Sequence, residues 1–509
     1  MNAAPTPAVE LRAVTKRFGA VLANQSVNLG IRRGTIHGII GENGAGKSTA
    51  MKVLYGMYRP DGGQVFVNGQ PCEWSSPADA IARGIGMVHQ HFMLAGPHTA
   101  LDNIILGAEP RAWAMIDRPS ARDHLERLSG QYGLAVDFAR RVEELPVGVQ
   151  QRVEILKLLY RAAEVLILDE PTAVLTPQET ARLFANLRRL RDEGKTILFV
   201  THKLKEVMAC TERVSVFRAG TVVAEVETDR TNAQELANLM VGRKVALSLN
   251  VPSGRPGAEG VLKVQGLSLF GERGTRPRLA DVSLVVKRGE IVGVAGVEGN
   301  GQSELLRAIL HPAERANRTE GRVECLGKDV THWPAARIRE LGVAVIPEDR
   351  LRDGLIADAP VSENFLLSLH RRRQFCESGW LRWRNARAAA GKALETYDVR
   401  PRDLNLPAGR LSGGNQQKLI VAREFETNPQ MVIAAQPTRG VDVGAIEFIH
   451  QRIVQARDGG AGVLLVSSEL DEILALSDRI LVMYEGRIVA EFERGQVSER
   501  ELGLKMGGG

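Results

Sequence analysis

Short apolar runs alternate with amphipathic stretches along this chain. Residues 35–40 (TIHGII), 165–169 (VLILD) and 196–200 (TILFV) have the apolar composition of buried strands. Between such runs, residues 46–56 (GKSTAMKVLYG) and 150–162 (QQRVEILKLLYRA) have the pattern of helices. Strands that alternate with helices predict an α/β fold in which helices cover a mostly parallel sheet.

The whole pattern occurs twice. Residues 32–56 (RRGTIHGIIGENGAGKSTAMKVLYG) return as residues 287–310 (KRGEIVGVAGVEGNGQSELLRAIL), and residues 146–172 return as residues 412–438. The stretch between the copies, LNVPSGRPGAEG, has the Pro, Gly and Ser of a connector. We therefore predict a first domain over residues 1–248, a linker over residues 249–260 and a second domain over residues 261–509.

Length and composition agree with two large domains. The chain has 509 residues, of which 44% are hydrophobic and 25% charged, as in an ordinary α/β protein. No stretch approaches about 18 uninterrupted apolar residues, and no signal-peptide core follows the start, so we expect the chain to stay in the cytoplasm. Its formal charge of +6 does not by itself imply nucleic acid. The cysteines form no CxxC pair, so we expect reduced thiols at Cys72, Cys210, Cys325 and Cys376.

A glycine-rich loop carries the first candidate chemistry. Residues 41–48 (GENGAGKS) fit GxxxxGK[ST] between a predicted strand and a predicted helix, which is the context of a phosphate-binding loop. Backbone N–H groups and the helix N-terminus can hold phosphate oxygens, Lys47 can neutralise their charge, and Ser48 can ligate Mg²⁺. The predicted nucleotide-binding residues here are Gly41, Asn43, Gly44, Ala45, Gly46, Lys47, Ser48 and Thr49.

Polar side chains end two later strands. Asp169 can hold Mg²⁺ through water, and Glu170 beside it can polarise an attacking water. His202 follows the run 196–200, where an imidazole can touch a γ-phosphate. A buried strand that ends in a solvated acid pair and a structural histidine are the plainer alternatives. The glycine-rich loop, the acid pair and the histidine nevertheless follow one another along the chain, and this combination favours nucleotide hydrolysis.

With these motifs, each half resembles the ATP-binding subunit of an ABC transporter over nearly the whole chain. The family signature LSGGQ has a counterpart in LSGGN at residues 411–415. The resemblance implies two tandem P-loop ATPase domains, each with a mostly parallel core sheet and a helical subdomain, that use ATP and Mg²⁺. It implies that Phe18 stacks on adenine and that Gln90 links Mg²⁺ to a membrane partner. The implied signature and loop residues at the nucleotide are Ser412, Gly413, Gly414 and Asp442.

The second half departs from the family pattern at its charged positions. Its glycine loop keeps Gly296, Gly301 and Ser303. The lysine, the Gln90 counterpart, the two acids and the histidine are replaced in order by Gln302, Glu348, Ala435, Gln436 and Ser468. Gln302 supplies no cation, Ala435 no metal ligand and Gln436 only a poor base, so this half has lost its charge chemistry.

The first half departs from the pattern in its signature. Residues 145–149 read LPVGV, so the signature serine is replaced by Pro146, which has no hydroxyl and no backbone N–H. In the loop that connects the two halves, Thr176 stands at the position of the aspartate that the second half keeps as Asp442. In the head-to-tail pairing of this family, each ATP site combines one half's phosphate loop with the other half's signature. The two halves would pair within this chain, and all the replaced family residues of both halves would then fall in the same ATP site. We expect one catalytic and one degenerate site, and nucleotide binding at the latter stays open.

Two fused ATPase halves that have no membrane-spanning segment imply that separate subunits span the membrane. By the resemblance these are two membrane-spanning permease subunits and an extracytoplasmic solute-binding protein, with the chain at the cytoplasmic face of the membrane. Residues 347–355 (PEDRLRDGL) and 437–445 (PTRGVDVGA) resemble importers of simple sugars and nucleosides. Residues 434–440 (AAQPTRG) look more like the nucleoside branch. Import of a monosaccharide such as ribose is the alternative.

Two other classes stay open. Twin ATPases of this superfamily also act on ribosomes or DNA, and the stretch 370–387 interleaves Arg with Trp in a way that suits nucleic acid. Its plainer interpretation is a solvated or headgroup-facing surface. Ribosome-acting twins usually have two intact sites, and DNA-repair twins have zinc-binding cysteines, so we expect no nucleic-acid partner. An ATP-binding regulator without a transport role is disfavoured by the complete catalytic set.

Overall fold

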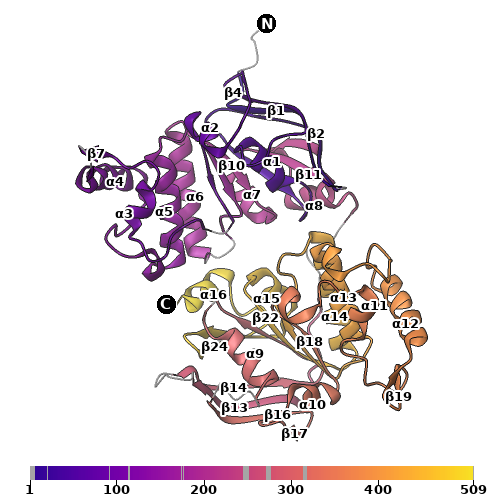
Figure 1. Ribbon diagram of the computed structural model, residues 1–509. Coiled ribbons are helices and arrows are strands. Elements are labelled where there is room, and N and C mark those ends of the chain that lie inside the picture. Colours follow the sequence, from indigo (N-terminus) through magenta and orange to yellow (C-terminus); the bar gives the residue numbers. More distant parts are fainter. Residues whose placement is uncertain are drawn as a thin grey trace. The chain divides into compact units, whose positions relative to one another are not determined.

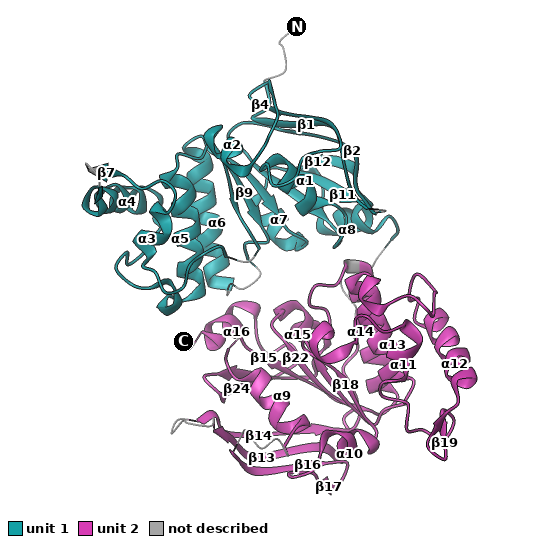
Figure 2. Cartoon of the chain, viewed as in Figure 1, with its two compact units in different colours: residues 1–245 teal, residues 246–509 magenta. Residues whose placement is uncertain are grey.

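The computed structural model describes residues 6–19, 21–90, 92–112, 115–172, 175, 177–244, 251–270, 277–297, 299–312 and 318–507. The chain divides into two compact units, residues 1–245 and residues 246–509 (Figure 2). Thr176 and the first two residues of the expected linker, 249 and 250, lie outside the described residues.

A six-stranded sheet forms the centre of the first unit (Figure 1). Its order is β12-β11-β3-β10-β9-β6, with parallel pairing except between β11 and β12. The strands are β3 (Ile36–Gly41), β6 (Ile85–Val88), β9 (Val165–Asp169), β10 (Thr196–Val200), β11 (Arg213–Arg218) and β12 (Thr221–Glu227). The three apolar runs are therefore β3, β9 and β10, which confirms the predicted parallel sheet. Their carboxyl ends lie at the same edge because the strands are parallel.

An antiparallel sheet of order β2-β1-β4-β5 and a set of helices complete the first unit. Its strands are β1 (Val9–Phe18), β2 (Val21–Ile31), β4 (Gly62–Val67) and β5 (Gln70–Cys72), and a small hairpin pairs β7 (Arg111–Ala112) with β8 (Met115–Ile116). The helices are α1 (Lys47–Leu54), α2 (Pro77–Ala82), α3 (Ala100–Ile105), α4 (Arg118–Tyr132), α5 (Val147–Tyr160), α6 (Pro177–Asp192), α7 (Leu204–Cys210) and α8 (Ala233–Val241), with 3₁₀ turns at Val142–Glu144 and Thr228–Arg230. Helices α3, α4 and α5 gather to one side as a helical subdomain (Figure 1).

Two hydrophobic clusters cover opposite faces of the six-stranded sheet. Ile197 and Phe199 of β10 belong to the cluster that contains α3 to α6. Leu198 and Val200 belong to the cluster that contains α1 and the antiparallel sheet. Successive side chains of a strand point to opposite faces, so a shift of one residue in register would exchange the two clusters. Burial on both faces explains why the run 196–200 is apolar throughout.

The second unit repeats this architecture. Its main sheet has the order β18-β21-β22-β15-β23-β24, and its antiparallel sheet the order β14-β13-β16-β17. The strands are β13 (Gly260–Phe270), β14 (Pro277–Lys287), β15 (Ile291–Ala295), β16 (Arg318–Cys325), β17 (Lys328–Asp329), β18 (Val343–Ile346), β19 (Cys376–Glu377), β20 (Trp380–Leu381), β21 (Met431–Ala435), β22 (Gly462–Ser467), β23 (Arg479–Tyr484) and β24 (Arg487–Glu493).

Helices cover this second set of sheets in the same way (Figure 1). They are α9 (Gln302–Leu310), α10 (Ala335–Glu340), α11 (Val361–Leu366), α12 (Trp383–Thr396), α13 (Gly413–Phe425), α14 (Val443–Asp458), α15 (Leu470–Leu476) and α16 (Glu499–Met506), with a π turn at Arg350–Gly354 and a 3₁₀ turn at Ala408–Arg410. None of the helices that the structure describes is long and apolar enough to span a membrane.

The described part of the expected linker lies against the second unit. The buried guanidinium of Arg457 donates a hydrogen bond to the Pro252 carbonyl (3.0 Å), and the Gly254 N–H donates to Asp478 Oδ1 (2.7 Å). These contacts join residues far apart in the sequence, so residues 252–254 are fixed to the second unit.

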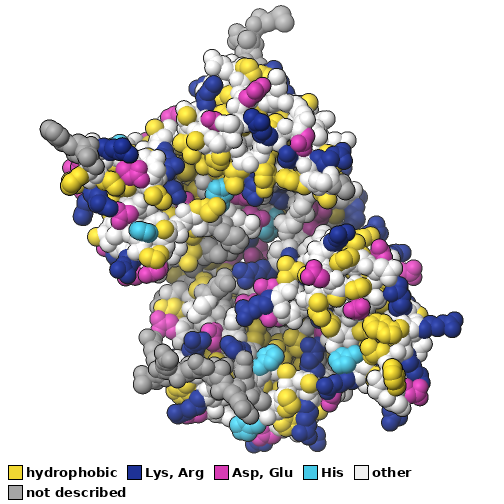
Figure 3. Space-filling view, viewed as in Figure 1, with side chains coloured by type: hydrophobic (Ala, Val, Ile, Leu, Met, Phe, Trp, Pro, Cys, Tyr) yellow, Lys and Arg dark blue, Asp and Glu magenta, His cyan; other side chains and the backbone are white. Residues whose placement is uncertain are grey.

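The Arg- and Trp-containing stretch 370–387 forms the hairpin β19–β20 and the start of α12. Trp380 is 81% exposed and Trp383 45% exposed. Two of its arginines pair with acids, Arg382 with Glu377 and Arg371 with Glu340. Figure 3 shows acidic and basic side chains interspersed on the visible face of the molecule.

Candidate nucleotide site

The phosphate loop of the first unit connects β3 to α1, as its motif requires. Gly46 precedes α1 with a φ of 96°, and a Cβ there would lie 2.5 Å from the Ala23 carbonyl oxygen. Only glycine fits this left-handed position and close approach. Asn43 and Gly44 are exposed at the tip of the loop, whereas Ala45 is buried beneath it. The loop therefore presents its backbone to solvent at the start of a helix.

Lys47 is a buried cation held by its own loop. Its Nζ donates to the carbonyl oxygens of Gly41 (2.7 Å) and Glu42 (3.0 Å). Burial lowers the pKa of Lys47, and the charges of Glu170, Asp169 and Glu42 act against that lowering. The ammonium group is thus folded over the loop that would hold phosphate oxygens, and it can exchange a carbonyl for a phosphate oxygen without moving far.

Asp169 ends β9 next to the serine of the loop. The Ser48 hydroxyl donates to Asp169 Oδ1 at 3.2 Å. Burial raises the pKa of the Asp169 carboxyl, as does the charge of Glu170, while the hydrogen bond from Ser48 and the charge of Lys47 lower it. A desolvated carboxylate beside a hydroxyl is an arrangement that a hard divalent cation stabilises.

Glu170 lies at the centre of a three-residue network. Its backbone has a φ of 49° and its N–H donates to the Val200 carbonyl (2.9 Å), which aims the side chain across the sheet edge. Gln90 Nε2 donates to Glu170 Oε2 (2.8 Å), and His202 Nδ1 lies 2.9 Å from Glu170 Oε1. Burial acts to raise the pKa of Glu170, but His202 and Lys47 hold it below its usual range.

The structure therefore brings the predicted catalytic residues of the first unit together. Gln90 contacts Glu170 in this structure, and its predicted role as a Mg²⁺ ligand stays a prediction. Phe18 is 42% exposed and packs edge-on against Tyr58, with 5.1 Å between ring centroids. Tyr58 was not found from the sequence, since only the fold places it beside Phe18 at the end of β1.

The phosphate loop of the second unit has the backbone conformation of the first loop but no lysine. Gly301 has a φ of 107° at the start of α9, and a Cβ there would lie 2.9 Å from Gly486 Cα. Gln302, buried like Lys47, donates from Nε2 to the Val297 carbonyl (3.2 Å). The hydroxyl of Ser303 donates to Glu348 Oε2 (2.7 Å), because Ala435 at the end of β21 has no carboxylate to accept from it.

A neutral pair replaces the glutamate and histidine in the second unit. Gln436 has a φ of 45°, close to that of Glu170. Its Nε2 donates to Ser468 Oγ (2.8 Å), and its Oε1 accepts from the Ser468 N–H (3.0 Å). The backbone geometry of the site is thus preserved while both the base and the imidazole are absent.

The two signature segments begin the helices α13 and α5. Ser412 caps α13, and its Oγ accepts hydrogen bonds from the backbone N–H (3.4 Å) and Nδ2 (2.8 Å) of Asn415. A Cβ at Gly414 would lie 2.3 Å from Asp442 Oδ2, so Asp442 packs directly on this glycine. In the first unit Pro146 stands at the cap of α5 and offers no side-chain hydrogen bond. Pro146 therefore lacks both the hydroxyl and the backbone N–H that Ser412 has at the matching cap.

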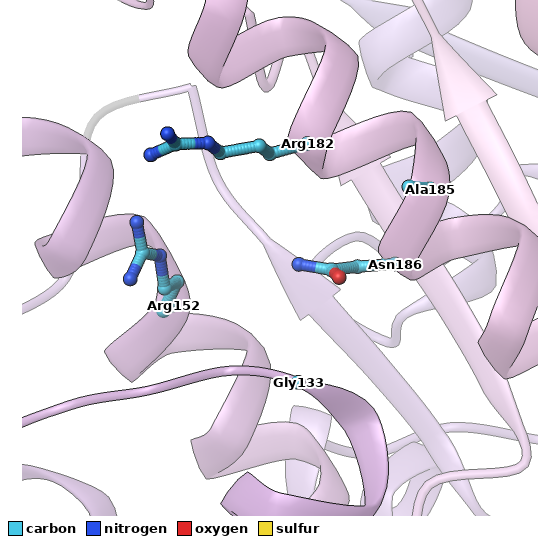
Figure 4. A pocket seen from close by; sticks show the side chains of 5 residues that line it. All are labelled: Gly133, Arg152, Arg182, Ala185 and Asn186. Atoms are coloured by element: carbon cyan, nitrogen blue, oxygen red, sulfur yellow. The ribbon is translucent and has the colours of Figure 1, made fainter.

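A small cavity of the first unit lies apart from these residues. It is lined by Gly133, Arg152, Arg182, Ala185 and Asn186, from the end of α4 and from α5 and α6 (Figure 4). None of the predicted site residues lines it.

The fold and the site together define a P-loop nucleotide-binding protein built from two cassettes. A family model described as ABC transporter matches residues 24–173 and again residues 279–439. The chain therefore belongs to the ABC transporter family, as a tandem ATP-binding protein that hydrolyses ATP.

Individual relatives match nearly the whole chain. It is 45% identical to the guanosine import ATP-binding protein NupO of Bacillus subtilis (strain 168), covering 98% of this chain and 97% of that protein. It is also 45% identical to the nucleoside import ATP-binding protein NupA of Lactococcus lactis subsp. cremoris, covering 98% of each. The ribose import ATP-binding protein RbsA 1 of Rubrobacter xylanophilus is 40% identical over 99% of this chain and 98% of that protein. A solved ATP-binding cassette of an ABC transporter is 23% identical, with a TM-score of 0.42 over 47% of this chain and all of that one.

Proposed function

We propose that this chain hydrolyses ATP to drive the uptake of nucleosides through separate membrane-spanning subunits. The observation that carries the proposal is its 45% identity, over 98% of its length, to ATP-binding proteins of guanosine and nucleoside import. The partners are two permease subunits and an extracytoplasmic solute-binding protein, and the chain works at the cytoplasmic face of the membrane. The absence of a membrane-spanning helix among the described helices is compatible with a peripheral subunit.

Hydrolysis is assigned to the first unit because its polar residues form one network. The Glu170 carboxylate stays ionised at neutral pH, since its pKa is held below the usual range, and it accepts a proton from the attacking water. His202 and Gln90 orient that carboxylate from either side. Lys47 neutralises charge on the β- and γ-phosphates.

Mg²⁺ fits the donors of the same site. The Ser48 hydroxyl, the Asp169 carboxylate and the Gln90 amide oxygen are hard oxygen ligands of the kind that Mg²⁺ prefers. When bound, the ion would stabilise charge on the transferring phosphoryl group. Phe18, with Tyr58 against its edge, offers an exposed ring on which the adenine stacks.

We further propose, from the family's head-to-tail pairing, that the intact signature of the second unit completes this catalytic site. The complementary losses support this assignment: the first unit keeps the lysine, the acids and the histidine, and the second keeps Ser412, Gly413, Gly414 and Asp442. If the intact phosphate loop of the first unit pairs with the intact signature of the second, the phosphate loop from Gly296 to Ser303 is left with the altered signature at Pro146. That second site is degenerate and does not turn over ATP.

Uptake of labelled substrates tests the proposal. Cells that depend on this chain receive either the native sequence or Glu170→Gln, and uptake of nucleosides and of pentoses is measured for each. We expect Glu170→Gln to abolish nucleoside uptake and to leave pentose uptake unchanged. Gln436→Ala, at the matching position of the second unit, is the control and retains uptake. Loss of pentose uptake alone would transfer the assignment to sugar import, and no change in either would exclude both cargo classes.

A further inference from the structure

One short segment of the second unit touches both the phosphate loop and the signature region. Glu348 accepts a hydrogen bond from Ser303 of the loop at 2.7 Å. Two residues later, the Arg350 guanidinium donates from Nε to Gln416 Oε1 (3.1 Å), on the signature helix α13. It also donates to the carbonyl oxygens of Arg439 (2.7 Å) and Gly440 (3.4 Å), just before Asp442. Arg350 thus connects three segments that lie far apart in the sequence.

The backbone around Arg350 is fixed in a way that suits this role. Asp349 Oδ1 accepts from the N–H groups of Leu351 (3.0 Å) and Arg352 (3.1 Å), which caps the π turn Arg350–Gly354. The guanidinium lies so close to the signature that a Cβ on Gly413 would be 2.7 Å from Nη2. The signature glycine therefore leaves space for the arginine as well as offering its own N–H.

The position of this cation is not one that helix stability favours. The N-terminus of α13 carries the positive end of the helix dipole, where a positive side chain is disfavoured. Partial burial also lowers the pKa of Arg350, so the charged form is held by its acceptors rather than by solvent. A purely structural contact at this place would be better made by a neutral side chain.

The first unit offers an internal comparison. The position that matches Arg350 is Phe92, and Gln150, which matches Gln416, donates instead to the Leu145 carbonyl (2.9 Å). The signature of that unit has Pro146 in place of serine. The guanidinium is therefore present in the unit with the intact signature and absent from the unit with the altered one.

We propose that Arg350 is a positioning residue that holds the signature, residues 412–414, and the loop 439–442 in the arrangement needed for hydrolysis. It acts through the Ser412 hydroxyl and the signature N–H groups, which complete the catalytic site in the proposed function on which this inference rests. The same segment carries Glu348, so Arg350 also connects the signature to the segment that would receive a permease.

Steady-state hydrolysis of Mg²⁺-ATP by the full chain tests the role. In Arg350→Ala we expect kcat to fall about tenfold or more, because small displacements of positioned groups are that costly, while KM for ATP changes by less than about twofold. Arg350→Lys keeps the charge but cannot reach three acceptors, so we expect its kcat to lie between those of the native chain and Arg350→Ala, and more than about twofold below the native value. Arg352→Ala is the matched control, since Arg352 is 84% exposed and its nearest acid, Asp353, is 3.9 Å away.

The outcomes separate this role from a structural one and from the proposed function. A fall in kcat with an unchanged melting temperature and an unchanged affinity for ATP supports positioning. A kcat for Arg350→Ala or Arg350→Lys within about twofold of the native value overturns it, and so does a parallel loss of kcat, ATP affinity and melting temperature. If Arg350→Ala does not fold, the Arg350→Lys measurement decides. A native chain that hydrolyses no ATP would overturn the proposed function and this inference together, whereas an active native chain with active variants overturns the inference alone.

Discussion

Glu170 and His202 meet across the ends of two adjacent parallel strands, with 2.9 Å between Glu170 Oε1 and His202 Nδ1. The second unit places Gln436 and Ser468 at the matching strand ends, with 2.8 Å between the amide nitrogen and the hydroxyl. The same backbone arrangement thus holds a carboxylate and an imidazole in one unit, and an amide and a hydroxyl in the other. Matched substitutions in the two units therefore separate the effect of the side-chain chemistry from that of the fold.

His202→Ala is expected to lower kcat for ATP hydrolysis about 100-fold, because Glu170 loses the partner that orients its carboxylate and lowers its pKa. Ser468→Ala removes the matching side chain of the second unit, and its kcat stays within about twofold of the native value. Phosphate release from the purified chain measures both. Equal losses in the two variants would contradict the assignment of catalysis to the first unit.

Lys47→Ala removes the buried cation over the first phosphate loop and is expected to abolish hydrolysis. Gln302→Ala removes a neutral side chain that binds its own loop at Val297, so it changes hydrolysis little. Titration with a fluorescent ATP analogue, run beside the hydrolysis assay, shows whether Lys47→Ala also loses binding at the first loop. Comparable losses of hydrolysis in both variants would exclude a single catalytic site.

The signature segments give a third matched pair. Ser412→Ala removes the hydroxyl that caps α13, and we expect kcat to fall about tenfold or more, because the proposed catalytic site would lose a hydrogen-bond donor to the transition state. Pro146→Ser restores the family residue in the first unit, yet it is expected to leave kcat unchanged, since the degenerate site still lacks its cation, acid and base. A gain of hydrolysis in Pro146→Ser would show that the second site is only weakly impaired.

The sequence is sufficient to predict the strands and the loop chemistry, because those depend on local constraints. A run such as 165–169 is buried on both faces of a sheet and must be apolar, and a loop that joins a strand to a helix around phosphate needs glycine at Gly46. Such requirements are visible at fixed spacing along the chain.

Contacts between distant segments could not be predicted in the same way. Gln90 and Glu170 are 80 residues apart, and their 2.8 Å contact depends on how β6 and β9 pair. The packing of Tyr58 on Phe18 and the three acceptors of Arg350 likewise follow from the fold and not from any periodicity. The sequence motifs identify the residue types of the site, whereas tertiary packing determines which of these residues are in contact.

The cysteines should differ sharply in reactivity. Burial raises the pKa of Cys210 and of Cys325 to about 12, and Cys72 is also buried, whereas Cys376 is half-buried on the hairpin β19–β20. Since the thiolate is the reactive form, iodoacetamide at pH 8 is expected to modify Cys376 first in the native chain. Peptide mass spectrometry measures this order, with Cys376→Ser as the control that removes the fast reaction. Early labelling of Cys210 or Cys325 would contradict their burial.

His37 should make the first unit sensitive to acid. The side chain is fully buried in β3, its Nε2 lies 2.8 Å from Ser215 Oγ, and its Nδ1 has no partner among the described residues. Burial, together with the charges of Arg213 and Arg32, lowers the pKa of His37 from 6.5 to about 3. Between these values the unfolded state binds a proton that the folded state does not, so the contribution of His37 to stability is complete above pH 6.5 and is lost as the pH falls toward 3.

Between pH 7 and pH 5 this difference corresponds to about 2 kcal/mol of unfolding free energy. His37→Gln cannot take up the proton, so we expect the pH dependence of the opening of β3 to shrink by about that amount. Hydrogen-exchange mass spectrometry of β3 peptides at the two pH values measures the opening free energy locally. Ser215→Ala keeps the imidazole buried and serves as the control, with an undiminished loss of stability at pH 5. An equal pH dependence in the native chain and in His37→Gln would mean that other groups produce the acid sensitivity of this strand.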